Sequence, residues 1–379
     1  MVISNAKIRA DEGPYRVMVV DDSAVIRGII TRWLEADPDM SVVATCANGA
    51  QALRVAASKG CEVIVLDIEM PEMDGIAALP QLTRAVPGVQ IIMSSTLTRR
   101  NAEISMRALA MGAADYVTKP ESLRGATTAE DFRHELTEKV KALAAVYRRR
   151  HGGHTPAAPV APAAAPVARP AAPAAALRPF SHEKPAILAI GSSTGGPQAL
   201  MAVLSQLGSD VTVPIVITQH MPATFTALLA EHLERVTHRP CAEARDGDVV
   251  KPGTITVAPG GQHMVLVRDG AQTLHVSLNC DPPENFCRPS VDPLFRSAAR
   301  LFGSRTLGLV LTGMGSDGRE GARAIVAAGG SIVAQDEASS VVWGMPGAVA
   351  TAGLCSAILP LGQIASELKK IISGGSRAA

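Results

Sequence analysis

The second half of the chain contains a hydroxyl-bearing turn that could support nucleophilic chemistry. In AILAIGSSTGGPQALMAVL, residues 191–195 match the G-x-S-x-G spacing of a nucleophile elbow, where small residues permit a sharp turn from strand to helix. In that register Ser193 stands at the start of the helix, where free backbone N–H groups, such as that of Thr194, stabilise an oxyanion. A glycine-rich turn of this kind also binds phosphate. The turn alone therefore leaves both a hydrolase and a phosphate-binding module open.

A serine nucleophile needs a base, and the base needs a group that orients it. His220 ends the apolar run VITQH, and Asp317 lies just beyond the run LVLTGMGSD. Each also has a structural interpretation, His220 as a packed polar residue and Asp317 as a cap of the helix expected from Arg319. His263, in VAPGGQHMVLV, is an alternative base or a residue that contacts the substrate. A hydrolase is favoured because the turn contains neither G-x-G-x-x-G nor G-K-[ST].

The first half carries acidic residues where strands are expected to end. Asp21 and Asp22 follow one apolar run and Asp67 follows another. Packed carboxylates repel each other unless a hard cation balances them, and Mg²⁺ held by carboxylates and water suits phosphate chemistry. Lys119 adds a positive charge after the fifth run, and Ser95, after the fourth, could hydrogen-bond an added phosphoryl group. Any one of these aspartates by itself is more readily a helix cap or turn residue.

Short β-rich runs alternate with helical segments in the first half of the chain. The expected strands are 16–20, 41–44, 62–66, 89–93 and 114–117, and helices include 23–36, 50–59 and 128–150. This alternation implies a parallel sheet covered on both faces, with its sites at the carboxyl ends of the strands. We therefore expect residues 15–150 to form a flavodoxin-like α/β domain with a five-stranded parallel sheet.

A second α/β domain is expected at 184–373. Its strands are 186–190, 214–218, 254–258, 307–311 and 331–334, and its helices are 197–207, 225–234, 293–302 and 319–328. Residues 264–278 look like a β-hairpin inserted into a doubly wound, Rossmann-like and mostly parallel sheet. Between the domains, residues 151–183 are rich in Ala and Pro. We expect an extended linker there, because proline blocks helix formation and small side chains build no core.

Composition excludes several classes of protein. Among 379 residues, 36 basic and 35 acidic side chains leave a net charge of +1, which favours neither nucleic acid nor an anionic membrane as partner. No apolar run approaches the ~18 residues of a membrane span. The six cysteines form no C-x-x-C pair, as expected of a cytoplasmic protein. A transcriptional regulator has little support, because the second half lacks a basic recognition helix.

The motifs DD, LDIEMPEMDG, SST and DYVTKP occur in this order, and residues 16–150 resemble the receiver domain of bacterial response regulators. The resemblance implies that Asp67 accepts phosphate from a histidine kinase in two-component signalling. It implies that Mg²⁺ is held by three carboxylates and one backbone carbonyl, those of Asp21, Asp22, Asp67 and Glu69. It also implies three residues that couple phosphorylation to conformation, namely Ser95, Tyr116 and Lys119. The register at 94–96 is open by one position, and Tyr116 could equally be a half-buried sheet residue.

The segments GSSTGGP, QHMP, APGGQH, RPSVDPLF and TGMGSDG follow in order, and residues 184–372 resemble the chemotaxis protein-glutamate methylesterase family. The resemblance implies a triad of Ser193, His220 and Asp317, assisted at the oxyanion site by Thr194 and Met314. It implies that the substrates are γ-glutamyl methyl esters, and often specific glutamines, of chemoreceptors. No metal is expected at the hydrolase site, because ester hydrolysis through a nucleophile does not need one.

Two further expectations concern regulation and departures from the family pattern. A receiver joined to a hydrolase suggests that the first domain covers the active-site face until Asp67 is phosphorylated. The chain order Ser, His, Asp differs from that of α/β-hydrolases, so their fold is not expected. Two features depart from the usual family pattern, namely the segment IIMSSTLT and Cys287, which precedes RPSVDPLF. Neither is expected to touch the proposed triad.

Overall fold

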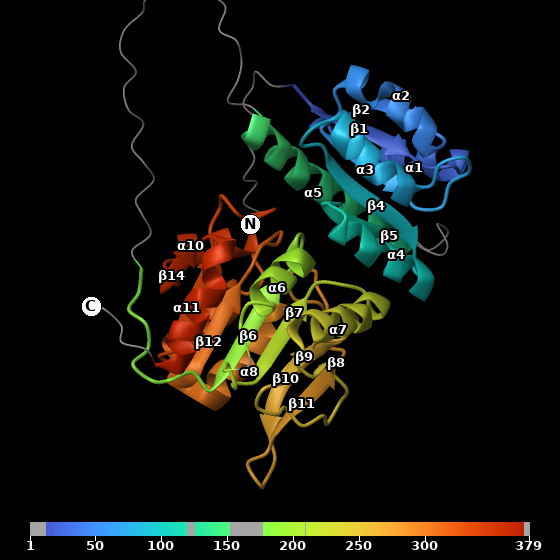
Figure 1. Ribbon diagram of the computed structural model, residues 1–379. Helices are drawn as coiled ribbons and strands as arrows, with labels where there is room; N and C mark the ends of the chain where they lie inside the picture. Colours follow the sequence, from blue (N-terminus) through green and yellow to red (C-terminus); the bar gives the residue numbers. More distant parts are fainter. Residues whose placement is uncertain (1–12, 120–125, 152–176, 209, 375–379) are drawn as a thin grey trace, which may run out of the picture. The chain divides into compact units, whose positions relative to one another are not determined.

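The computed structural model describes residues 13–119, 126–151, 177–208 and 210–374 (Figure 1). The chain divides into two compact units, Met1–His151 and Gly152–Ala379. Of the expected linker, residues 152–176 lie outside the described residues. Within the described part, no helix is both long enough and apolar enough to cross a membrane.

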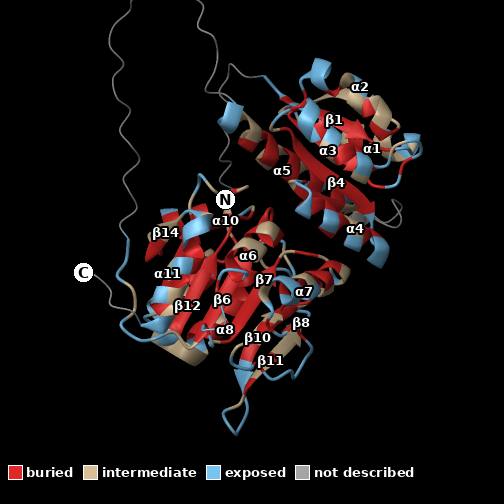
Figure 2. Cartoon of the chain, viewed as in Figure 1, coloured by how far each residue is buried: buried red, intermediate tan, exposed pale blue. Residues whose placement is uncertain are grey.

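The first unit is a five-stranded parallel sheet with the strand order β2-β1-β3-β4-β5, as the sequence predicts. Its strands are β1 (Tyr15–Val20), β2 (Met40–Cys46), β3 (Val63–Asp67), β4 (Gln90–Thr96) and β5 (Asp115–Lys119). Its helices are α1 (Ala24–Glu35), α2 (Gly49–Lys59), α3 (Gly75–Ala85), α4 (Arg99–Ala110) and α5 (Ala126–His151). Every residue of β3 is buried, because helices cover both faces of a parallel sheet. Figure 2 shows β4 of the same sheet mostly in the colour of buried residues.

Local side-chain signals start four of these helices. In each case an N-cap side chain accepts a hydrogen bond from the backbone N–H three residues later. The N-cap residues are Ser23, Asn48, Asp74 and Thr98. Gly75 opens α3 directly against the end of β3, since a Cβ atom there would lie 2.1 Å from the Asp67 carbonyl oxygen. Glycine thus lets α3 start close to the acidic strand end.

The second unit is built on a seven-stranded sheet with the order β14-β13-β12-β6-β7-β9-β8 and parallel pairing throughout. Its strands are β6 (Ile187–Ser192), β7 (Ile215–Gln219), β8 (Cys241–Glu243), β9 (Ile255–Val257), β12 (Thr306–Val310), β13 (Ser331–Gln335) and β14 (Ala357–Leu359). The expected hairpin is present as a separate antiparallel pair, β10 (His263–Arg268) and β11 (Leu274–Asn279). The predicted fold class is therefore confirmed for both units.

The helices of the second unit are α6 (Gly196–Leu204), α7 (Ala223–Thr237), α8 (Val291–Phe302), α9 (Arg319–Ala327), α10 (Met345–Thr351) and α11 (Leu361–Ser373), with a short 3₁₀ turn at Gly303–Arg305. Helix α8 packs against β6 of the sheet and also against β10 of the hairpin. Its Leu294 and Phe295 are completely buried, and such side chains each contribute about 1.5–3 kcal/mol. The start of α8 is thereby held firmly beside the ends of the central strands.

Candidate active site

The three residues of the expected triad follow the carboxyl ends of three neighbouring strands. Ser193 follows β6, His220 follows β7 and Asp317 lies beyond β12, and these strands lie side by side in the order β12-β6-β7. The chain builds the sheet outward from β6 through β7 and later returns to the other side of β6 with β12. Sheets of this kind bind ligands where the strand order reverses, outside the carboxyl ends of the strands. The topology thus brings the three residues to the edge where a site is expected.

The turn after β6 is held by a glutamine from the neighbouring strand. Ser192 Oγ donates to Gln219 Oε1 at 2.7 Å, and Gln219 Nε2 donates to the Ser193 carbonyl at 2.9 Å. The N–H of Ser193 donates to the Thr312 carbonyl at 3.1 Å. Gly195 has a φ of +74°, which favours glycine, and α6 begins directly after it. Ser193 is half-buried in this tight turn.

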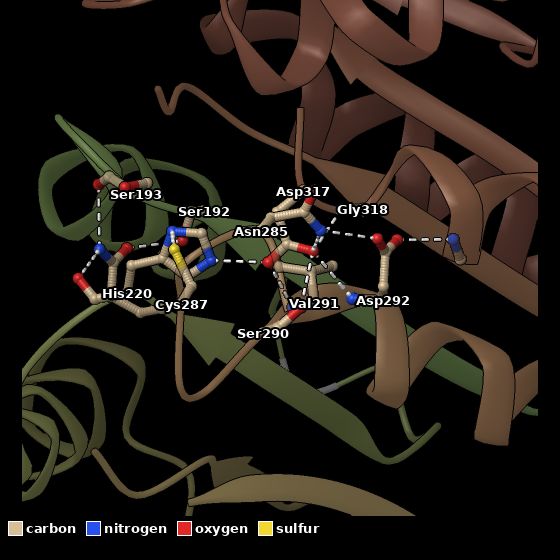
Figure 3. A network of polar contacts seen from close by, with 12 residues as sticks. Ser192, Ser193, His220, Asn285, Cys287, Ser290, Val291, Asp292, Asp317 and Gly318 are labelled. Carbon is tan, nitrogen blue, oxygen red and sulfur yellow. Dashed lines mark hydrogen bonds and ion pairs between the residues drawn. The ribbon is translucent and has the colours of Figure 1, made fainter. Parts of the chain in front are cut away.

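Asp317 is buried and accepts hydrogen bonds from six donors (Figure 3). His220 Nε2 is 2.7 Å from its Oδ2. The other donors are the N–H groups of Val291, Asp292 and Gly318, the hydroxyl of Ser290 and the amide of Asn285. Burial by itself raises the pKa of Asp317, but the hydrogen bonds from His220 and its neighbours outweigh it and lower the pKa to about 2. The carboxylate is therefore charged and fixed in orientation.

The position of Asp317 differs from that of a simple helix cap. The N-cap residue of the helix that starts at Arg319 is Gly318, and it makes no side-chain capping bond. Asp317 instead accepts the first N–H groups of α8, a helix from elsewhere in the chain, while it holds His220. An orienting carboxylate in this position can keep one ring nitrogen of the histidine protonated and stabilise the imidazolium form.

His220 has both ring nitrogens engaged. Nε2 faces Asp317, and Nδ1 lies 3.4 Å from Sγ of Cys287. Burial by itself lowers the pKa of His220, but the neighbouring Cys287 and the hydrogen bond to Asp317 outweigh it and raise the pKa to about 10. Among the described residues no hydrogen bond joins Ser193 Oγ to His220. The structure therefore brings His220 and Asp317 into contact, and Ser193 Oγ is not hydrogen-bonded to them among the described residues.

His263, the alternative base, is committed to the loop that carries Cys287. It is buried, its Nδ1 accepts the N–H of Ser290 at 3.1 Å, and its Nε2 lies 3.2 Å from the Pro282 carbonyl. Because a carbonyl only accepts, Nε2 carries the proton. With both nitrogens bound to backbone groups, His263 positions residues 282–290 next to His220.

The two residues expected at the oxyanion site lie on either side of Ser193 in the fold. Thr194 is buried, and its carbonyl accepts a hydrogen bond from Thr312 Oγ1 at 2.9 Å. Its backbone N–H has no partner in the described part of the chain, so this group is available to a ligand. Met314 is half-buried on the loop after β12. A Cβ atom on the adjacent Gly313 would lie 2.9 Å from Ser193 Cβ, so this loop passes close to the serine.

Several site residues were not assigned from the sequence. Gln219, Asn285, Ser290 and Asp292 all contact Ser193 or Asp317. Cys287 contacts His220, so the expectation that this cysteine does not touch the proposed triad is wrong. The motifs QHMP and RPSVDPLF contain three of these residues, and the hydroxyl and carboxyl groups at the start of the helix in RPSVDPLF were an available signal. Asn285 and Cys287 had no such signal, because they lie in an irregular loop.

The first unit gathers Asp21, Asp22 and Asp67 at the ends of β1 and β3. Oxygen atoms of these three carboxylates lie within 4.8 Å of one another. Lys119 Nζ lies 2.7 Å from Asp21 Oδ2 and 2.8 Å from Asp67 Oδ1. Burial raises the pKa of Asp67 to about 6 although Lys119 opposes this shift. Three converging oxygen ligands fit a hard divalent cation such as Mg²⁺. Glu69, whose carbonyl was expected to join them, is an exposed residue two positions after Asp67.

The structure separates the two serines at the end of β4. Ser94 is paired in register with Asp67, is buried, and its hydroxyl finds no partner among the described residues. Ser95, the residue expected beside the phosphate, has its hydroxyl 3.2 Å from that of Ser105 in α4. Successive residues of a strand point to opposite faces, so only one of the two serines can face Asp67. Tyr116 is buried, with Lys139 Nζ 5.1 Å from its ring centre.

Comparisons with known proteins give a match for each of the two units. The CheB methylesterase family matches residues 188–368, and the response regulator receiver domain matches residues 17–129. The chain is 55% identical over 366 residues to a protein-glutamate methylesterase/protein-glutamine glutaminase of Rhodopseudomonas palustris, covering 95% of each chain. It is 54% identical over 380 residues to a protein of the same name, of group 2 operon, in Bradyrhizobium diazoefficiens, covering 96% of each.

A solved structure, the CheB methylesterase catalytic domain of Thermotoga maritima, matches with a TM-score of 0.48 and 37% identity, covering 50% of this chain and 100% of that one. The matched families and the fold define a response regulator with an enzymatic second unit. The cluster of Asp21, Asp22 and Asp67 in the first unit agrees with this class. The chain belongs to the CheB methylesterase family. The family resemblance seen in the sequence is thereby confirmed.

Proposed function

We propose that this chain is a phosphorylation-controlled protein-glutamate methylesterase and protein-glutamine glutaminase that acts on chemoreceptors in bacterial chemotaxis. The relatives of the same name match over nearly the whole chain, and both expected units are present. One observation carries the hydrolase mechanism: Asp317 holds His220 at 2.7 Å, at the strand edge where Ser193 also lies. The protein works in the cytoplasm, where the receptor glutamates and a kinase are available.

The reaction proceeds by acyl transfer to Ser193. Ser193 Oγ attacks the ester carbonyl of a receptor glutamate while His220 Nδ1, the ring nitrogen that does not contact Asp317, takes the hydroxyl proton. The N–H of Thr194 stabilises the oxyanion, and Met314 forms the neighbouring wall. Collapse of the intermediate releases methanol, which receives its proton from His220. Water activated by His220 then cleaves the acyl-enzyme to glutamate, and a glutamine substrate releases ammonia by the same steps.

We assign control of this reaction to the first unit. Residues 15–150 form the receiver, 151–183 the linker and 184–373 the catalytic domain. Asp67 takes a phosphoryl group from the histidine kinase of the chemotaxis system, and Lys119 and Tyr116 respond to it. Asp21, Asp22, Asp67 and the carbonyl of Glu69 would hold Mg²⁺, which neutralises the charge around the phosphoryl group. The responding hydroxyl is that of Ser94, in register with Asp67, rather than that of Ser95.

Methanol release from methylated chemoreceptor tests the proposal. Wild type and Ser193→Ala are compared, each with and without a small phosphodonor and Mg²⁺. We expect release that the phosphodonor stimulates and that Ser193→Ala abolishes. A wild-type protein that releases no methanol from a competent receptor preparation would refute the esterase assignment. Stimulation that persists in Asp67→Asn would refute the assignment of the phosphorylation site.

A further inference from the structure

The thiol of Cys287 contacts the ring nitrogen of His220 that the proposed mechanism uses as the base. An imidazole has two nitrogens, and Asp317 engages Nε2 at 2.7 Å. Nδ1 is therefore the nitrogen left to take a proton from Ser193, and it lies 3.4 Å from Cys287 Sγ (Figure 3). We propose that Cys287 is a positioning residue for the general base, because its sulfur competes with Ser193 for Nδ1 of His220. This inference rests on the proposed role of His220 as the base.

The loop that carries Cys287 is held in place by hydrogen bonds. The N–H of Cys287 donates to the carbonyl of Glu284, and the N–H of Glu284 donates back to that of Cys287. Arg296 of α8 holds the Glu284 carboxylate with two hydrogen bonds of 2.9 and 2.5 Å. Asn285 and Phe286, the two residues within this turn, have φ angles of +52° and +62°. Left-handed residues other than glycine persist only where the surrounding structure holds them, so the loop sets the position of the sulfur.

Two neighbouring groups favour the imidazolium form of His220. Cys287 faces the ring from the loop that precedes α8, and Asp317 faces it from the loop after β12. Asp292, at the start of α8, is a further acidic group of this cluster, and it accepts a hydrogen bond from the side-chain amide of Asn285. Both contacts of the ring favour its charged form, in line with its raised pKa. A protonated His220 cannot take a proton from Ser193. The sulfur therefore delays activation of the serine until the pair separates or loses its proton.

The remaining cysteines provide a comparison within the same molecule. Cys46, Cys61, Cys241 and Cys355 are buried, and burial raises the pKa of each thiol. Such thiols react slowly, because only the thiolate is the nucleophile. Cys280 is exposed and lies seven positions before Cys287, which is half-buried. On accessibility alone, Cys280 would react faster. A faster reaction at Cys287 would therefore report its pairing with His220.

Alkylation by iodoacetamide tests the pairing without any need for esterase activity. The thiolate sulfur forms a bond to the reagent's methylene carbon and iodide leaves, and peptide mapping of the folded full-length chain follows each cysteine. At neutral pH we expect Cys287 to react about tenfold or more faster than Cys280, and His220→Gln to abolish the difference. Equal rates for the two cysteines, or a fast Cys287 in His220→Gln, would overturn the proposal.

The pH dependence of methanol release tests the effect on catalysis. A base must be unprotonated, so kcat/KM rises with pH through the pKa of His220. The sulfur of Cys287 favours the imidazolium, so Cys287→Ala should move that rise about 1–3 units towards lower pH. Cys287→Ser should behave alike, because a hydroxyl stays neutral, whereas Cys280→Ala should match wild type. An unmoved rise in both Cys287 variants would overturn the proposal. If no variant releases methanol while the alkylation result holds, the proposed function fails and the pairing stands.

Discussion

Asp292 and Asp317 are two buried carboxylates that share a hydrogen-bond donor. The side-chain amide of Asn285 donates to Asp292 Oδ2 at 3.0 Å and to Asp317 Oδ1 at 3.1 Å. Asp292 also accepts the N–H of Gly321 at 2.6 Å. Like charges at this spacing repel each other, and the amide lies where it relieves the repulsion. The position of the carboxylate that holds His220 thus depends on a residue in an irregular loop.

Replacement of Asn285 by leucine should impair catalysis more than folding. The change removes one donor from each carboxylate, which costs about 1–3 kcal/mol, and leaves Asp317 less firmly held. We expect kcat to fall about tenfold or more while KM changes little. Steady-state methanol release measures both constants. Asn279→Ala, at the end of the hairpin strand β11, is the matched control; a kcat for Asn285→Leu equal to that control would contradict the prediction.

The stability of the second unit should fall as the pH rises through the range in which Asp292 ionises. Burial first, and then the charge of Asp317, raise the pKa of Asp292 to about 6. A carboxyl group whose pKa is raised by folding binds its proton more tightly in the folded state. Its contribution is therefore present at low pH and is lost between about pH 4 and pH 6.

Asp292→Asn should remove this loss, which amounts to about 2–3 kcal/mol. Urea unfolding at several pH values measures it. The chain with Asp292 and the Asp292→Asn variant should both also carry Asp67→Asn. The carboxyl group of Asp67 has a raised pKa and titrates in the same range. Parallel stability curves for the two proteins from pH 4 to pH 7 would show that Asp292 does not contribute.

Loss of Lys119 should make the first unit dependent on Mg²⁺. Its ammonium group lies 2.7 Å from Asp21 and 2.8 Å from Asp67, so Lys119→Ala removes the positive charge that faces two buried carboxylates. We expect a lower melting temperature for the first unit and recovery when millimolar Mg²⁺ is added. Lys139→Ala, which breaks the buried pair with Asp115 at 3.2 Å, is the control. It should also destabilise, but Mg²⁺ should not restore it.

The two serines at the end of β4 should differ in their effect on activation. Ser94 is in register with Asp67, whereas the hydroxyl of Ser95 meets Ser105. Ser94→Ala should therefore abolish most of the stimulation of methanol release by a phosphodonor, and Ser95→Ala should retain it. Both variants should keep the unstimulated rate. The opposite pattern would return the role to Ser95.

A methyl group on Gly313 should displace the serine turn. A Cβ atom there would lie 2.9 Å from Ser193 Cβ and 2.4 Å from Met345 Sδ, closer than atoms pack. We expect Gly313→Ala to lower kcat/KM about tenfold or more, in line with a shift of the nucleophile by a fraction of an ångström. Gly362→Ala, in α11 with open space around the new atom, is the control and should leave activity unchanged. Wild-type activity in Gly313→Ala would mean that the turn tolerates the shift.

Much of the molecule is readable from the sequence, because its signals are local. Short continuous apolar runs mark most of the strands of both sheets, and the alternation with helices implies parallel pairing. Residues that follow a parallel strand gather at one edge, so Asp21, Asp67 and His220 could be placed without coordinates. The short elements β8, β14 and α10 were not expected, because three to seven residues carry too little periodicity.

Tertiary structure alone decided the details of both sites. Which of Ser94 and Ser95 faces Asp67 depends on strand register, where a shift of one residue exchanges the faces. The contacts of Asn285 and Cys287 with Asp317 and His220 depend on left-handed loop residues and on the packing of α8 between sheet and hairpin. Sequence spacing identifies the residues at a strand end, but the partner of each ring nitrogen is set by packing between segments far apart in the chain.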